Sequence, residues 1–190
     1  MGPEGERDEY LMDRVAQDQP GCLEVLVRRH ATPLLTFLHR MAGDRHRAEE
    51  LFQEVFLAVW LKRRQYQYPR PFKPWLYAIA LNKCRAAFRL RTRPPRLLGD
   101  EDAYAPSGRE DSPPDRLIAS ETAELISRAV TRLPPQQRAV VVLRVWQGLS
   151  YARIASVVGC NEATARSHMH HGLVTLRQAL EPILERQPLP

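Results

Sequence analysis

The feature that most constrains the fold of this chain is an apolar stripe with helical spacing between residues 47 and 62. Apolar side chains recur there every three or four residues, which is the period of an α-helix with one buried face. No segment shows the sustained alternation of apolar and polar residues that predicts a half-buried strand. We therefore expect an all-α protein. The stripe consists of Ala48, Leu51, Phe52, Val55, Phe56, Val59 and Trp60.

Further helices are predicted on both sides of this one. A short helix is expected over about 9–17, ended by Pro20 and Gly21, and a longer one is indicated by a second apolar stripe. Three prolines between residues 69 and 74 argue against helix in that stretch. We therefore expect the next helix to run from about 75 to 93. The second stripe contains Leu34, Leu35, Leu38 and Met41.

The composition of segment 94–116 indicates a linker between two parts of the chain. It contains five prolines and two glycines, and it carries six acidic against three basic side chains, so it has little to bury. The flanking parts are both basic, with 17 Lys/Arg against 11 Asp/Glu in 1–93 and 8 against 5 in 117–190. We expect two small helical domains, 1–93 and 117–190, joined by a flexible acidic linker. Their charge suits a polyanion, although ordinary solvated faces would also account for it.

The second half carries the pattern of a helix-turn-helix over residues 148–170. The sequence predicts helices over about 121–133, 136–146, 151–158 and 162–183. Ser150 and Asn161 suit helix N-caps, and Gly159 tolerates the positive φ of the turn between the last two helices. The predicted shared core of the motif consists of Ile154, Val158, Ala165 and Met169.

The outward face of the last helix is predicted to meet DNA. On a helical wheel this face lies opposite the apolar residues, where a recognition helix would enter a major groove. Arg166 is the best candidate for a bidentate bond to guanine. A plain helical hairpin is the alternative interpretation. The outward residues are Ala163, Arg166, Ser167, His170 and His171.

Other classes of protein find little support in the residues. No paired carboxylates, Cys/His pair or glycine-rich phosphate loop suggests catalysis, so we expect no enzyme, no cofactor and no metal site. Cys22, Cys84 and Cys160 are isolated and odd in number, which is typical of reduced thiols. The N-terminus lacks the apolar core of a signal peptide, and no stretch approaches the roughly 20 apolar residues of a membrane span. We expect a cytoplasmic protein.

The two halves together resemble the extracytoplasmic-function (ECF) group of the sigma-70 family of sigma factors. Residues 48–60, followed by 70–83, resemble region 2 of that family. Residues 133–138 and 148–151, ahead of the helix-turn-helix, resemble region 4. The resemblance implies a subunit that binds core RNA polymerase and directs initiation at promoters with −10 and −35 elements.

The resemblance also assigns a protein-binding role to the helix over 47–62. Region 2 is implied to dock on the clamp helices of the β′ subunit, and region 4 to adjoin the β flap. A polar face that meets only solvent is the alternative. The implied polymerase-binding residues are Glu49, Glu50, Gln53 and Glu54.

The loop after that helix is implied to melt and hold the −10 element. Single-stranded DNA needs cations for its phosphates and aromatic faces for its bases, and this segment supplies both. A flipped base would lie beside Asn82. Phe72 and Trp75 have an equally good interpretation as core residues. The implied −10 residues are Arg63, Arg64, Tyr66, Tyr68, Arg70, Phe72, Lys73, Trp75 and Asn82.

Region 4 is implied to read the duplex −35 element through Arg166, Ser167, His170 and His171. Relatives usually carry arginine at the positions of His168 and His171, which suggests a weak grip. Members of the group are often held inactive by an anti-sigma protein, so such a partner is consistent with the resemblance. Two other functions stay open: a helix-turn-helix regulator that acts without polymerase, and a helical adaptor that binds only protein.

Overall fold

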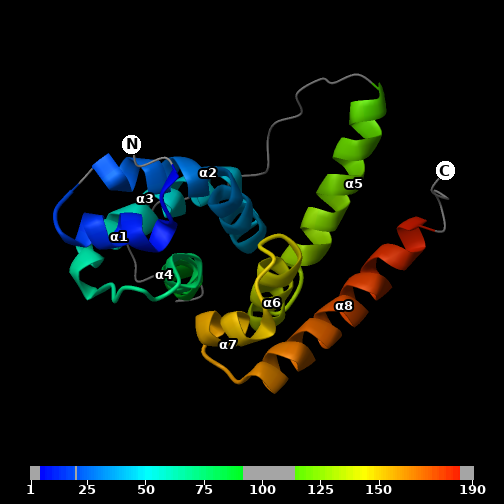
Figure 1. Ribbon diagram of the computed structural model, residues 1–190. Coiled ribbons are helices and arrows are strands. Elements are labelled where there is room, and N and C mark those ends of the chain that lie inside the picture. Colours follow the sequence, from blue (N-terminus) through cyan, green and yellow to red (C-terminus); the bar gives the residue numbers. More distant parts are fainter. Residues whose placement is uncertain (1–4, 20, 92–113, 185–190) are drawn as a thin grey trace, which may run out of the picture.

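The computed structural model describes residues 5–19, 21–91 and 114–184, and within these ranges it is built from helices and turns alone (Figure 1). The all-α prediction is therefore confirmed. Most of the predicted linker, residues 94–113, lies outside the described residues. The helices are α1 (Asp8–Ala16), α2 (Gly21–Ala42), α3 (Arg45–Leu61), the 3-10 turn η2 (Arg63–Gln65), α4 (Phe72–Arg91), α5 (Pro114–Thr131), α6 (Pro135–Val145), α7 (Tyr151–Val158) and α8 (Glu162–Leu184).

The predicted helix signals of the second half are confirmed. The Ser150 side chain accepts a hydrogen bond from the Arg153 backbone N–H at 3.4 Å, and the Asn161 side chain accepts one from Thr164 at 2.7 Å. Gly159 ends α7 with a φ of +83°, where a side chain would be strained. These caps fix the sharp turn between α7 and α8.

Two helix starts differ from the prediction. Helix α4 begins at Phe72 and not near residue 75, because Pro74 lies in the first turn, where its missing N–H costs little. Glu9 of α1 accepts a hydrogen bond from the Phe72 backbone N–H at 3.3 Å, which supports this start from 63 residues away. Helix α5 begins at Pro114, inside the segment assigned to the linker.

Helices α1 to α4 form the N-terminal block, in which α2 contacts α1, α3 and α4. The stripe on α3 faces inward, with Val55 and Val59 fully buried. From α2, Phe37 packs edge-on against Tyr77 of α4 with ring centroids 5.1 Å apart. The N-terminal block is thus a small bundle with its own apolar centre.

Helices α5 to α8 form the C-terminal block, with α6 in contact with both α7 and α8. Gly172 allows α8 to approach α6, because a Cβ atom there would lie 2.7 Å from Val141 Cγ2. The predicted core of the helix-turn-helix is confirmed, since Ile154, Val158, Ala165 and Met169 are all buried.

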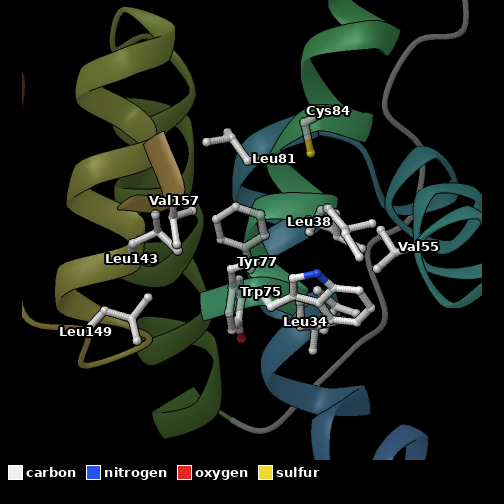
Figure 2. Close-up of a cluster of buried hydrophobic side chains, with 14 of the residues drawn as sticks. Leu34, Leu38, Val55, Trp75, Tyr77, Leu81, Cys84, Leu143, Leu149 and Val157 are labelled. Atoms are coloured by element: carbon white, nitrogen blue, oxygen red, sulfur yellow. The ribbon is translucent and has the colours of Figure 1, made fainter. Parts of the chain in front are cut away.

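The two blocks pack directly against each other. Helix α4 contacts α7, and α2 contacts both α5 and α6. Figure 2 shows Tyr77 and Leu81 of α4 facing Leu143 and Val157 of the C-terminal block. Tyr77 and Leu143 are fully buried, so the apolar centres of the blocks merge into one core.

Candidate functional site

The four implied polymerase-binding residues lie along one solvent-facing side of α3. Glu49, Glu50 and Gln53 are exposed, and Glu54 is half-buried. Their carboxylates already pair within the block: Arg45 with Glu49 at 3.2 Å, Arg47 with Glu50 at 2.5 Å and Lys83 with Glu54 at 3.1 Å. Ion pairs this exposed contribute little to stability, so a basic partner surface can replace them at low cost.

Two exposed leucines continue this side of α3 towards its C-terminus. Leu57 and Leu61 are 59% and 68% exposed, and they follow Gln53 at spacings of four residues. Sequence reasoning missed them because it listed only polar residues for the face opposite the buried stripe. The exposed side of α3 is therefore acidic at its start and apolar at its end.

The implied −10 residues in and after the loop between α3 and α4 fall into a buried set and a more exposed set. Tyr66, Phe72 and Trp75 are buried, with Tyr66 and Trp75 ring centroids 5.2 Å apart. The Tyr66 hydroxyl donates to the Arg70 carbonyl, and burial together with the nearby Glu9 carboxylate raises the pKa of this hydroxyl. These three rings hold the loop in shape.

Two of the loop arginines are bound to an aspartate of the N-terminal segment. Asp18 Oδ1 accepts from Arg63 Nε at 2.9 Å and from Arg63 Nη2 at 2.7 Å, while Asp18 Oδ2 accepts from Arg64 Nη2 at 2.7 Å. Arg63 also donates to the Trp60 carbonyl at 3.0 Å and lies 4.0 Å over the Trp60 ring. Arg63 is accordingly 19% exposed at its side chain, against 73% for Arg64.

The remaining implied −10 residues present polar or aromatic surface to solvent, with one exception. Tyr68 is 55% exposed, and Arg70 and Asn82 are also exposed. Lys73 is half-buried, because its Nζ donates to the backbone carbonyl of Gln147 in the C-terminal block at 2.7 Å. Burial lowers the pKa of Lys73. The loop thus offers one aromatic ring and two arginines on its surface, and α4 adds the amide of Asn82.

The implied −35 residues all lie exposed on α8. Arg166 stacks 4.4 Å over the ring of Tyr151 and pairs with Glu162 at 2.6 Å, which holds its guanidinium at the start of the helix. Ser167, His170 and His171 follow on the same exposed side. A surface helix that presents one arginine and several hydrogen-bonding side chains fits a DNA major groove.

Three further polar side chains join the two blocks. The Tyr77 hydroxyl donates to Gln147 Oε1 at 2.5 Å, and Gln147 Nε2 donates to the Pro33 carbonyl of α2 at 3.1 Å. Arg85 of α4 donates to the Val158 carbonyl at 2.9 Å, one of the free carbonyls at the end of α7. No sequence signal marks these partners, because they lie 70 to 114 residues apart.

A fourth such side chain, Arg138, is a buried cation held by carbonyl groups. It donates to the Met41 carbonyl near the end of α2 at 2.8 Å, and to the carbonyls of Thr131 and Leu133 after α5. The negative ends of two helix dipoles therefore surround it. Burial lowers the pKa of Arg138.

Neither a metal site nor a membrane span is found among the residues that the structure describes. No group of three or more His, Cys, Asp or Glu side chains there is placed to bind a metal ion. No described helix is long and apolar enough to cross a bilayer.

Comparison with known proteins decides the family. The model of sigma-70 region 2 matches residues 26–93, and that of sigma-70 region 4 matches residues 123–176. The RNA polymerase sigma factor CarQ of Myxococcus xanthus is 32% identical over 169 residues, covering 89% of this chain and 95% of CarQ. The chain is a member of the ECF group of the sigma-70 family. It is thus an RNA polymerase sigma factor, from a family of non-enzymatic regulators of transcription that bind DNA.

Solved structures share the fold of this sigma factor. CnrH in complex with the cytosolic domain of CnrY has a TM-score of 0.70 at 21% identity, over 92% of this chain and 97% of that one. The sigma factor RpoE in complex with the anti-sigma factor NepR from Bartonella quintana has a TM-score of 0.65 at 20% identity, over 83% and 96%. These structures share the fold, and the sequence-based family assignment is confirmed by the two family models and by the similarity to CarQ.

Proposed function

We propose that this sigma factor divides promoter binding between its two blocks. The N-terminal block, residues 1–93, docks on core polymerase and holds the melted −10 strand, and residues 117–190 read the −35 duplex. The segment 94–116 links them. The observation that carries the proposal is the presence, in one chain, of an exposed acidic and apolar side of α3, an aromatic–basic loop, and an exposed recognition helix.

Docking is assigned to α3 and to the clamp helices of the β′ subunit. Glu49, Glu50, Gln53 and Glu54 supply charge for a basic surface, and Leu57 and Leu61 supply apolar area beside it. Each apolar side chain removed from water stabilises a complex by about 1.5–3 kcal/mol before association costs. Region 4 is assigned to the β flap.

The −10 strand is assigned to the exposed part of the loop and to α4. Arg64 and Arg70 meet phosphates, Tyr68 offers a ring for a base, and Asn82 offers hydrogen bonds to a flipped base. Arg64 meets its phosphate once Asp18 is displaced, and Arg63 and Lys73 can join once their own present partners are displaced. Tyr66, Phe72 and Trp75 act from the core by holding the loop in place.

The −35 duplex is assigned to Arg166, Ser167, His170 and His171. Arg166 is the specificity contact, since a bidentate arginine–guanine pair discriminates by about 1–3 kcal/mol. The few cations on this face favour a modest contribution to affinity, because phosphate contacts supply much of it. An anti-sigma factor, of the kind that NepR is for RpoE, is a further proposed partner, and the cytoplasm the proposed place of action.

Run-off transcription with purified bacterial core polymerase on a randomised promoter library tests this function. We expect transcripts from templates that share two sequence elements at a fixed spacing. Failure to bind core polymerase, or binding without initiation on every template, would refute the proposal. A chain that binds duplex DNA tightly without polymerase and starts no RNA would be a helix-turn-helix regulator instead.

A further inference from the structure

Asp18 has a backbone conformation that its residue type does not favour. Its φ is +63°, in the left-handed region where glycine is unstrained and aspartate is only tolerated. Asp18 follows the end of α1, where glycine would make the same turn at lower cost. Its side chain therefore has a role that glycine could not supply, and the contacts of that side chain show which one.

The carboxylate of Asp18 pairs with two arginines of the loop that the proposed function assigns to DNA. Arg63 donates two hydrogen bonds to Asp18 Oδ1 and Arg64 donates one to Asp18 Oδ2, and such charge-assisted bonds are also the ones that arginines make to phosphate. Asp18 is 48% exposed, so incoming DNA can reach and replace it. The two guanidinium groups hold the pKa of Asp18 below its usual value, so the competing charge persists at neutral pH.

We propose that Asp18 is a specificity-determining residue that competes with the DNA backbone for Arg63 and Arg64. A phosphate must displace it before both arginines can bind, so Asp18 weakens every non-specific contact at the loop. Only promoter DNA, which adds base contacts, then binds well. This inference rests on the proposed role of the loop in holding single-stranded DNA.

Binding of a labelled 20-nucleotide oligothymidylate to the full chain, measured by fluorescence anisotropy across salt concentrations, tests the proposal. We expect Asp18→Asn and Asp18→Gly to bind about threefold or more tightly at low salt, with the gain fading as salt rises. Asp18→Gly also removes the backbone strain of the positive φ, so this variant is expected to fold and serves as a check on Asp18→Asn. Asp13→Asn on α1 makes the same change of charge and should leave the affinity nearly unchanged.

The effect of Asp18 must act through the arginines. In an Arg63→Ala/Arg64→Ala background, Asp18→Asn should change nothing. A gain that persists in this background, or a gain equal to that of Asp13→Asn, would overturn the proposal. If the arginine double variant binds the oligonucleotide as well as the unaltered chain, the assigned role of the loop fails as well. If the arginine double variant binds weakly but Asp18→Asn does not raise the affinity of the unaltered chain, the loop keeps its assigned role and only the proposed competition by Asp18 is refuted.

Discussion

In the N-terminal block three of the four cations assigned to DNA are bound to other groups of the protein, whereas in the C-terminal block the proposed DNA-reading face is exposed to solvent. Arg63 and Arg64 are bound by Asp18, and Lys73 is bound by Gln147. On α8, Ser167, His170 and His171 are exposed. Arg166 is also paired, but within its own helix and at the surface.

This difference follows from what each block is proposed to bind. A major groove exists in any duplex, so a recognition helix can be ready in advance. A melted strand exists only after base pairs have opened, and opening costs a few kcal/mol. A loop whose cations are occupied until such a strand arrives avoids binding unsuitable DNA. The recognition helix is therefore exposed before DNA arrives, whereas most cations of the loop are released only when a suitable strand displaces their partners.

The largest expected effect concerns the exposed side of α3 in the N-terminal block. Glu49→Arg/Gln53→Arg puts positive charge where a basic partner is proposed, and we expect a loss of core polymerase affinity of about 100-fold or more. Competition with the unaltered chain for core enzyme measures it. Arg45→Glu, which removes the intrachain partner of Glu49, should leave binding within a few-fold. Equal binding by the double variant would show that this side of α3 is a solvated face.

The next effect concerns Arg138, whose side chain makes hydrogen bonds to both blocks. Arg138→Ala leaves the carbonyls of Met41, Thr131 and Leu133 without their shared donor, and it should lower the free energy of unfolding by about 3 kcal/mol. Urea unfolding followed by circular dichroism measures it. Arg132→Ala, at an exposed position, should change stability by less than about 0.5 kcal/mol. Equal losses in the two variants would mean that the buried contacts of Arg138 are not stabilising.

The smallest effect compares one thiol in each block. Cys84 is buried, and burial raises the pKa of its thiol to about 12, while Cys160 is half-buried in the turn of the helix-turn-helix. At pH 8 iodoacetamide should therefore modify Cys160 at least tenfold faster, as mass spectrometry of peptides would show. The raised pKa of Cys84 stabilises the fold below about pH 9, and this stabilisation should be lost between pH 9 and pH 12. Equal labelling rates would mean that the N-terminal core opens readily.

Local patterns predicted most of the helices and the composition of the helix-turn-helix, because periodicity and caps act over a few residues. The stripe on α3, the caps Ser150 and Asn161, and the turn at Gly159 belong to this class. The start of α4 at Phe72 could not be predicted, since the supporting carboxylate of Glu9 is distant in sequence.

The residue types of the candidate site could be predicted from the sequence, but the contacts and burial of those residues could not. The sequence shows arginines and tyrosines in the loop, yet it does not show that Asp18 binds two of the arginines or that Tyr66 is buried. The contacts of Gln147, Arg85 and Arg138 depend on how the two blocks meet, and a single sequence carries no local signal for that. Leu57 and Leu61 were missed because only polar residues were considered for the exposed face of that helix.

Promoter footprinting with the Arg166→Ala variant tests the division of labour most directly. With core polymerase on a promoter selected by run-off transcription, we expect this variant to lose DNase I protection at the −35 element. Permanganate-reactive thymines at the −10 element should remain once enough enzyme is added to offset an affinity loss of about 10-fold or more. Loss of −10 melting with −35 protection intact would contradict the account, because the two blocks would then not bind the elements assigned to them.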